Sequence, residues 1–362
     1  MIHFTENTKK HADACRFCWM CHHICPVGNA TGLERNTARA RGLAISLMAR
    51  GAADLTDDIL DNMYECCLCE GCASICITGW NPMMFVKEVR TKAALEGRLP
   101  AYVDKLLGNF EETGNVYGRK DLDTTLVSAL SRHTKKEDTL FFLGAEARYR
   151  MPANAINAIE AMEKTGVPFT LLQEEPDSAW CLDTLLGATA ETKDAMVRTA
   201  AVLKDYKTVV VYDPHDTKIF VREYSEYGVR PENVRFVTFT AFLAAHLNAL
   251  TLSKRDTTYT YQDNAMLVRE LSEEEAGRVI INACGNLAEM VPNKKETMYA
   301  GNLLMNEYLP DTMKLVASRR WKDAVDTGAQ ALVCASISEY AILLAAKPQN
   351  MALYMTEDLI VG

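Results

Sequence analysis

Hydrophobic residues are spaced differently in the first and last parts of the chain. In residues 1–110 apolar positions recur every three or four residues, for example at Leu43 and Leu47, which is the period of an α-helix. A further helix is expected after Thr56, and another is expected to begin at Asn81-Pro82, where asparagine suits the cap and proline the first turn. The sequence therefore predicts a helical N-terminal part.

From residue 138 short apolar runs alternate with helix-period segments. Strands are expected at 139–143, 167–172, 208–212, 234–239, near 259, and at 279–282, 331–334 and 351–355. Helices are expected at 153–165, 192–205, 218–227, 241–250, 296–306, 312–326 and 337–346. This alternation is typical of parallel sheets covered by helices. The order of elements repeats, so an α+β multidomain protein is expected, with a linker at 111–137 and two related α/β halves at 138–255 and 256–362.

Composition limits the class of protein. The 362 residues exceed the usual size of one domain, and 48% hydrophobic with 24% charged residues is ordinary for a globular chain. No run approaches the ~18–20 apolar residues of a membrane span. No secretory signal is visible at the N-terminus, so a cytoplasmic location is expected. The formal charge of −9 argues against a nucleic-acid partner.

Eight cysteines form two similar motifs. The first is Cys15-x2-Cys18-x2-Cys21-x3-Cys25-Pro26, and the second is Cys66-x2-Cys69-x2-Cys72-x3-Cys76. Three cysteines at this spacing wrap one cubane cluster, whereas the fourth leaves the turn and reaches the other cluster. The spacing therefore predicts two 4Fe–4S clusters with crossed ligand sets. One set is Cys15, Cys18, Cys21 and Cys76, and the other is Cys66, Cys69, Cys72 and Cys25.

A pair of four-cysteine zinc sites is the alternative. Such sites usually combine two C-x2-C pairs across a longer insert, and neither motif has that form. The second motif differs from the first because Ile77, not proline, follows Cys76. Cys67 duplicates a possible ligand, but only Cys66 keeps the x2 spacing to Cys69, so Cys67 is interpreted as a buried neighbour.

Two crossed cysteine motifs followed by two α/β halves resemble the iron–sulfur subunits related to heterodisulfide reductase. That group includes the iron–sulfur subunits of anaerobic glycerol-3-phosphate dehydrogenase, glycolate oxidase and the lactate-utilisation system. The resemblance covers nearly the full length of the chain. It implies an alpha-helical ferredoxin-like domain over residues 1–110, followed by the paired cysteine-rich domain of the family.

The cysteine motifs expected in the C-terminal halves are eroded. Each half of the family typically has a Cys-Cys-Gly and a Cys-Pro-x-Cys motif, and the corresponding segments here are Trp180-Cys181-Leu182, Ala283-Cys284-Gly285, Asp213-Pro214-His215-Asp216 and Cys334-Ala335-Ser336-Ile337. Too few thiolates remain for a cysteine-ligated cluster. Cys181, Cys284 and Cys334 are therefore interpreted as small buried residues.

Two alternatives for a residual site stay open. Cys284 and Cys334 could face a common pocket, and Asp213, His215 and Asp216 could form a metal site of hard ligands. The simpler interpretation is that Asp213 or Asp216 caps a helix that begins near residue 218.

The resemblance and the cysteines together predict an electron-transfer subunit of a hetero-oligomeric oxidoreductase. Its partners would be a flavin-containing dehydrogenase and possibly a further electron carrier, because a flavin accepts two electrons and releases them singly. No Gly-x-Gly-x-x-Gly follows a predicted strand, so the flavin is expected in the partner. Attachment to a membrane would then occur only through a partner. A catalytic reductase subunit with a modified C-terminal site, or a docking subunit, is the alternative.

Overall fold

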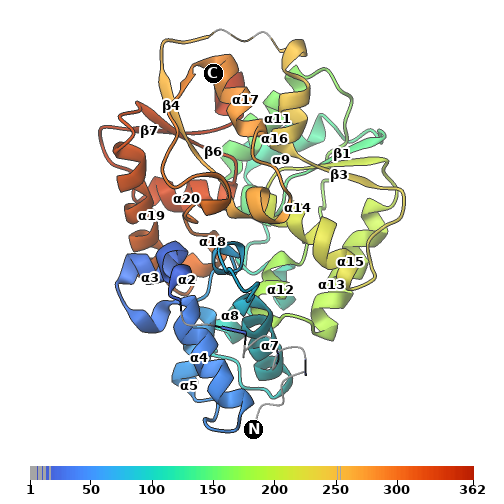
Figure 1. Ribbon diagram of the computed structural model, residues 1–362. Coiled ribbons are helices and arrows are strands. Elements are labelled where there is room, and N and C mark those ends of the chain that lie inside the picture. Colours follow the sequence, from blue (N-terminus) through green and yellow to red (C-terminus); the bar gives the residue numbers. More distant parts are fainter. Residues whose placement is uncertain (1–5, 7–9, 11–13, 16–17, 251, 253) are drawn as a thin grey trace.

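The computed structural model describes residues 6, 10, 14–15, 18–250, 252 and 254–362. Helices of the N-terminal part form one end of the molecule, and two small parallel sheets with their covering helices form the rest (Figure 1). The α+β class with parallel sheets is confirmed.

The N-terminal part is built from short helices with regular caps. Thr56 and Asn81 accept backbone N–H groups at the starts of α5 and α7, as the sequence predicts. The elements are α2 (Met20–Ile24), α3 (Pro26–Thr31), η1 (Glu34–Asn36), α4 (Ala38–Ala49), α5 (Asp57–Tyr64), α6 (Gly71–Ser74), α7 (Pro82–Leu95), α8 (Ala101–Thr113) and α9 (Thr124–Ser131).

The first α/β half contains one parallel sheet in the order β1-β2-β3. Strands β1 and β2 are almost entirely apolar, which suits a sheet buried on both faces. The elements are β1 (Thr139–Phe142), α10 (Ala145–Tyr149), α11 (Pro152–Lys164), α12 (Trp180–Leu186), α13 (Ala190–Leu203), β2 (Thr208–Val211), α14 (Pro214–Lys218), η2 (Ile219–Glu223), α15 (Tyr224–Glu226), β3 (Arg235–Thr238), α16 (Phe239–Ala245) and η3 (Leu247–Ala249).

The second half contains a parallel sheet in the order β5-β4-β6-β7. In Figure 1 this sheet lies beside the first, and both sit above the N-terminal helices. The elements are β4 (Thr258–Gln262), η4 (Met266–Glu270), α17 (Ala276–Cys284), β5 (Asn286–Leu287), η5 (Lys294–Glu296), α18 (Leu303–Asn306), α19 (Pro310–Val325), β6 (Ala331–Cys334), α20 (Ile337–Ala345), β7 (Ala352–Met355) and α21 (Asp358–Val361).

The two sheets share a strand order. An isolated parallel bridge joins Leu140 to Thr170 on the free side of β1. When this bridge stands for a second strand, the first sheet has the order 2-1-3-4 in chain order, and the second sheet has the same order. The strand expected at 167–172 is thus reduced to a single bridge, but the topology still supports two related halves.

The strand expected at 279–282 is wrong, because these residues belong to helix α17. Ile280 and Ile281 are fully buried, whereas Val279 is 47% exposed. The segment therefore buries one face of a helix and exposes the other. Gly277 allows the helix to approach the Tyr261 ring, since an added Cβ there would lie 2.3 Å from the ring. A run of three apolar residues, here followed by Asn282, cannot distinguish a strand from a buried helix by period alone.

Each half also carries a π-helix, η2 after α14 in the first half and η4 after β4 in the second. η2 ends in Val221-Arg222-Glu223 and η4 ends in Val268-Arg269-Glu270. π-Helical turns are rare and often occur at functional sites. Here Arg222 forms an ion pair with Glu270 of the other half. The repeated turns therefore join the two halves.

Arg90 of α7 joins the N-terminal helices to the first α/β half. Its side chain is fully buried and donates to the carbonyl oxygens of Met63, Cys66 and Thr184 at 2.7–2.8 Å. Its guanidinium also lies over the Tyr64 ring, 4.8 Å from the centroid. Only the planar fork of arginine can serve three acceptors in this arrangement.

We expect Arg90→Lys to lower the free energy of unfolding by roughly 2–4 kcal/mol, because it keeps the charge but loses at least one buried, charged hydrogen bond. Thermal unfolding under anaerobic conditions measures the change. Arg132→Lys is the matched control, because Arg132 forms a half-exposed ion pair with Glu163 and should change stability by less than about 0.5 kcal/mol. Equal effects of the two substitutions would contradict the role of Arg90.

Candidate metal centre

Four cysteines from the two motifs line one small cavity in the N-terminal part. They are Cys15, Cys18, Cys21 and Cys76, and together they form the first group. Cys76 belongs to the second motif in sequence, but it lies with the first three cysteines of the first motif. Trp19, Arg39, Thr78 and Trp80 complete the lining together with Met20.

The other four cysteines also lie near one another. The pKa of the Cys72 thiol is raised well above its ordinary value by burial and then by the nearby Cys66, Cys69 and Cys25. Burial also raises the pKa of Cys69 to about 11, where Cys25 and Cys66 contribute again. The structure thus brings Cys25 of the first motif to the three leading cysteines of the second. Cys25, Cys66, Cys69 and Cys72 form a second group, and crossed ligation of two clusters stays a prediction.

The two groups adjoin each other. Burial, followed by the neighbouring Cys15 and Cys25, raises the pKa of Cys21 to about 12. Cys67 is buried, as the sequence predicts, and lies beside Cys66 and Cys69. Buried thiols of this kind hold their protons in the absence of metal, whereas a coordinated thiolate is deprotonated outright.

The surroundings of the second group suit a negatively charged metal cluster. Arg41 is buried among Cys25 and Cys66, whose charges raise the pKa of the guanidinium. Its Nε and Nη1 donate to the carbonyl oxygens of Asn62 and Asn36, but Nη2 is buried without a hydrogen-bond partner among the described residues. A buried cation with a spare donor fits a thiolate-ligated cluster, because a buried charge needs an opposite charge nearby.

The first group has donors directed at sulfur. The backbone N–H of Trp80 donates to Cys76 Sγ at 3.3 Å. The Trp80 side chain is buried beside the cavity, and its indole N–H has no partner among the described residues. Hydrogen bonds to sulfur tune the potential of iron–sulfur clusters. The residues around both groups therefore fit iron–sulfur clusters.

Across the part of the chain that the structure describes, no three Cys, His, Asp or Glu side chains converge closely enough to hold a single metal ion. A tetrahedral zinc site, with Zn–S bonds of about 2.3 Å, needs four sulfur atoms within about 4 Å of each other.

No family model matches the chain. One subunit of the dihydromethanophenazine:CoB–CoM heterodisulfide reductase of Methanosarcina barkeri is 25% identical over 199 residues, which are 49% of this chain and 47% of that protein. The same subunit from Methanosarcina acetivorans is 24% identical over 362 residues, covering 88% of this chain and 85% of that protein. The chain is related to the iron–sulfur subunits of the heterodisulfide reductase type.

Two further matches extend the comparison. The "Probable iron-sulfur-binding oxidoreductase FadF" of Bacillus subtilis is 22% identical over 260 residues, covering 67% of this chain and 37% of that protein. The chain thus spans about half or less of the length of some curated relatives that it matches. The crystal structure of a hypothetical protein from Helicobacter pylori superposes with a TM-score of 0.64 at 12% identity, covering 99% of this chain and 72% of that one. That likeness shows a shared fold.

The eroded family positions hold a polar core. Asp213 is the cap residue, as the sequence allows, but the helix that it caps, α14, begins at Pro214 and not near residue 218. Its Oδ1 accepts from the backbone N–H and Nδ1 of His215 at 2.8 and 2.7 Å. Its Oδ2 accepts from Ser336 Oγ and from the backbone N–H of Ile337, both at 2.9 Å. Asp216 accepts from Ser178 Oγ at 2.5 Å. Both carboxylates are therefore engaged by donors, and Asp213 joins the ends of β2 and β6.

The three C-terminal cysteines are all buried. Cys181 lies near Tyr117 and Asp177, and its pKa is raised well above the ordinary value by burial. Cys284 ends α17 and donates weakly to the Leu359 carbonyl at 3.6 Å. Cys334 ends β6. Their burial agrees with the interpretation as small core residues, and the alternative of a shared pocket for Cys284 and Cys334 remains a hypothesis.

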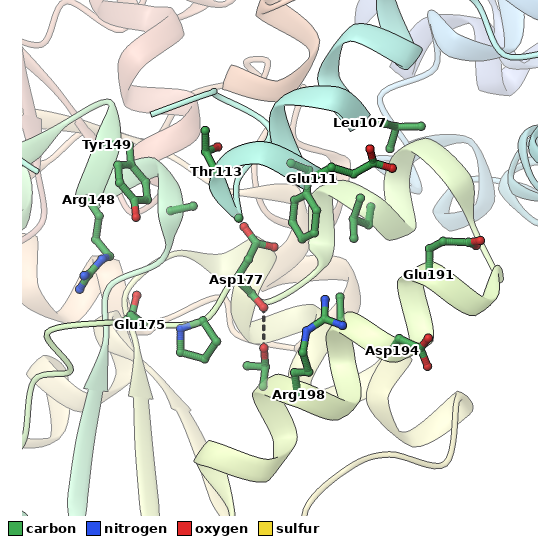
Figure 2. A pocket seen from close by; sticks show the side chains of 17 residues that line it. Leu107, Glu111, Thr113, Arg148, Tyr149, Glu175, Asp177, Glu191, Asp194 and Arg198 are labelled. Atoms are coloured by element: carbon green, nitrogen blue, oxygen red, sulfur yellow. Dashed lines mark hydrogen bonds between the residues drawn. The ribbon is translucent and has the colours of Figure 1, made fainter. Parts of the chain in front are cut away.

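A separate cavity of about 600 Å³ lies between α8 and the first half. Figure 2 shows Asp177 near its centre, with Glu111 of α8 on one side and Arg198 of α13 on the other. Thr199 Oγ1 donates to the Asp177 carbonyl at 2.6 Å. Burial and the nearby Glu175 raise the pKa of the Asp177 carboxyl to about 6. None of the eight N-terminal cysteines lines this cavity.

Sequence reasoning missed the arginines that hold the second cysteine group. Arg269 Nη1 donates to the Cys69 carbonyl at 2.7 Å, and its Nη2 and Nε donate to the carbonyls of Thr297 and Lys295. Arg90 holds the Cys66 carbonyl from the other side. The repeated Val-Arg-Glu after a strand in each half was the available signal for Arg269.

Among the described residues, no helix is long and apolar enough to cross a membrane.

Gly42 of α4 sets the position of Trp80 beside the first cysteine group. An added Cβ would lie 2.1 Å from Trp80 Cζ2. We expect Gly42→Ala to cost roughly 1–3 kcal/mol of stability from overpacking, and to speed the loss of iron from the first group. Thermal unfolding and iron retention against a chelator measure both effects.

Gly108→Ala is the matched control, because Gly108 also lies within a helix but has nothing within 4 Å of the added Cβ. It should be neutral or stabilise by up to about 1 kcal/mol. Iron retention in Gly42→Ala equal to that in Gly108→Ala would contradict the account of Trp80.

Proposed function

We propose that this chain is an iron–sulfur electron-transfer subunit of a multisubunit oxidoreductase. It relays single electrons between a flavin-containing dehydrogenase partner and another carrier. Two 4Fe–4S clusters carry the electrons. Cys15, Cys18, Cys21 and Cys76 hold one cluster, and Cys66, Cys69, Cys72 and Cys25 hold the other.

The crossing of the two motifs is the observation that carries the proposal. Cys76 lies in the cavity of the first group, and Cys25 lies among the thiols of the second. A chain that held two independent zinc sites would have no need to exchange the last cysteine of each motif. Exchange is the pattern of a two-cluster ferredoxin, in which the fourth cysteine of each run ligates the other cluster. The residues 1–110 would then form an alpha-helical ferredoxin-like domain, with 111–137 as a linker to the halves at 138–255 and 256–362.

The two clusters would differ in exposure. Cys18 is exposed and Cys15 and Cys76 are half-buried, whereas Cys69 and Cys72 are buried. Exchange of electrons with a partner protein needs a cluster near the surface, which is the first group. The second group faces the two α/β halves through Arg90 and Arg269 and would be the inner centre of the relay.

The relatives support the assignment to a complex. The relative with the largest coverage is named as a subunit of a reductase, which indicates an assembly of several chains for that protein. A flavin in the partner would convert two-electron oxidation of a substrate into single electrons for the clusters. We place the complex in the cytoplasm, with any contact to a membrane made by a partner.

The test is metal content and spectroscopy of anaerobically purified protein. About eight iron and eight acid-labile sulfide per chain are expected from two cubanes, and Cys76→Ser and Cys66→Ser should each reduce the iron toward about four through loss of a different cluster. Cys67→Ser is the matched control, because Cys67 is a buried neighbour of the same loop and should leave both clusters in place. Stoichiometric zinc, or loss of a cluster in Cys67→Ser but not in Cys66→Ser, would overturn the ligand assignment.

A further inference from the structure

A cavity of about 160 Å³ lies between the loop that carries the second cysteine motif, residues 66–70, and the buried polar residues around His215. Cys67, Leu68 and Glu70 line it on the side of the loop, and Trp180 and His215 line it on the side of the first half. The His215 ring stacks on Trp180 with centroids 4.7 Å apart. The loop that carries Cys66 and Cys69 therefore has an imidazole across a shared space, with Cys67, Leu68 and Glu70 as the lining residues of the loop.

His215 belongs to a hydrogen-bonded chain of buried groups. Its Nδ1 lies 2.7 Å from Asp213 Oδ1, and its Nε2 lies 2.7 Å from the Tyr299 hydroxyl. Tyr299 is close enough to Cys67 for that thiol to contribute to its raised pKa, after burial and Glu339. Asp213, His215 and Tyr299 thus form a continuous connection toward the inner cysteine loop.

Glu146 of α10 is one of the buried acids that lack full hydrogen bonding among the described residues, and it is the one that faces Asp213 and His215. Its Oε1 accepts from Tyr117 at 2.6 Å and from Ser338 Oγ at 3.1 Å. Glu146 is only 2% exposed, and its Oε2 is buried with no hydrogen-bond partner among the described residues. A buried carboxylate with an unpaired oxygen is costly, whereas the neutral acid is not.

Titratable groups from several elements face Glu146. They are Asp213, His215 and Asp216 around α14, Tyr117 before α9, Cys181 of α12, and Tyr299 before α18. Glu339 of α20 faces His215, and its negative charge contributes to the raised pKa of His215.

The charges in this core are set by their surroundings. His215 and the donors around it lower the pKa of Asp213 despite its burial, and Asp213 in turn raises the pKa of His215, so each partner favours the charged form of the other. Burial and the negative charge of Asp213 raise the pKa of Glu146 to about 7. Burial likewise raises the pKa of Glu339 to about 7. A small change of nearby charge is therefore enough to change the protonation of Glu146 near neutral pH.

We propose that Glu146 is a proton-binding site coupled to the second cluster through His215 and Tyr299, so that reduction of that cluster takes up a proton. The inference rests on the proposed function, because it requires a cluster at the second cysteine group. One electron from a one-electron donor, such as the reduced flavin of the partner, enters the cluster. One proton from water joins the Glu146 carboxylate. Both leave again when the cluster is oxidised.

The cavity shown in Figure 2 offers the proton a way in from solvent. Asp177 lies in that cavity, and the next residue, Ser178, donates to Asp216 at 2.5 Å. Gly144 allows this approach, because an added Cβ there would lie 2.1 Å from Asp216 Oδ2. Asp177 and Glu146 both contribute to the raised pKa of Asp216 after burial and Asp213. Asp177, Asp216 and Glu146 thus lie in the same electrostatic neighbourhood between this cavity and the core.

The test is a redox titration of the full-length, cluster-loaded protein followed by electron paramagnetic resonance at several pH values. The added negative charge of the reduced cluster raises the pKa of Glu146, so proton uptake occurs above about pH 7 and not where Glu146 is already protonated. The potential of the second cluster should be constant near pH 6. Between pH 7 and 8 it should fall by up to about 59 mV per pH unit, the value for one proton per electron.

Glu146→Gln should abolish this slope while both clusters remain visible, because the amide cannot bind the proton. Glu273→Gln is the matched control, since Glu273 is a mostly buried carboxyl with a raised pKa that faces Thr238 and Thr240 and lies outside the His215 chain. A carboxylic-acid band in the redox-difference infrared spectrum, present in the wild-type protein and absent from Glu146→Gln, would identify the acceptor directly.

The outcomes are distinguishable. Absence of clusters would refute the proposed function, whereas clusters with a pH-independent potential between pH 7 and 8 would refute only the proton site. A slope that persists in Glu146→Gln would assign the proton to another group and overturn the role of Glu146. If Glu146→Gln does not fold, a flat potential in the wild-type protein still contradicts the proposal, and a slope with a wild-type carboxyl band supports it.

Discussion

Two arginines donate hydrogen bonds to backbone carbonyls of the loop that carries Cys66 and Cys69. The placement of the second cysteine group depends on these contacts. Arg90 holds the carbonyl of Cys66, and Arg269 holds the carbonyl of Cys69. One arginine comes from the N-terminal helices and reaches Thr184 of the first half, and the other comes from the second half. The loop that would carry the inner cluster is therefore fixed by both halves at once. Preorganised ligands of this kind reduce the entropy that is lost when a cluster binds.

The same arginines also place positive charge near the thiols. Arg269 lowers the pKa of Cys69, although burial outweighs it, and Arg41 lies among Cys25 and Cys66. Thiolate-ligated clusters are negatively charged, and their potentials depend on local charge, hydrogen bonds and exposure. Buried cations beside the second cysteine group and solvent exposure of the first would give the two clusters different reduction potentials.

The erosion of the C-terminal cysteine motifs leaves ordered polar contacts in their place. Asp213 stands in one eroded motif and accepts from four donors, among them Ser336 and Ile337 of another eroded motif. Carboxylates and an imidazole thus hold together the ends of β2 and β6. The two sheets share a strand order, and the segments between their strand ends hold a core of ionisable groups in place of thiolates.

Much of this was predictable, for identifiable reasons. Local rules sufficed for the caps at Thr56 and Asn81 and for most of the alternating strands and helices, whereas the helix expected at 296–306 is helical only at its two ends. The crossed ligand sets stay a prediction from spacing. The strand expected at 279–282 failed because a short apolar run has no readable period. Arg90, Arg269 and Glu146 were missed because their roles arise from partners distant in sequence, such as Thr184, Cys69 and Ser338.

The most direct test of the central claim is the anomalous scattering of iron in crystals grown without oxygen. Two separate iron clusters are predicted, one bonded to Cys15, Cys18, Cys21 and Cys76, and the other to Cys25, Cys66, Cys69 and Cys72. A single cluster, uncrossed ligands in which Cys25 joins the first group and Cys76 the second, or iron bonded to Cys181, Cys284 or Cys334 would contradict the account.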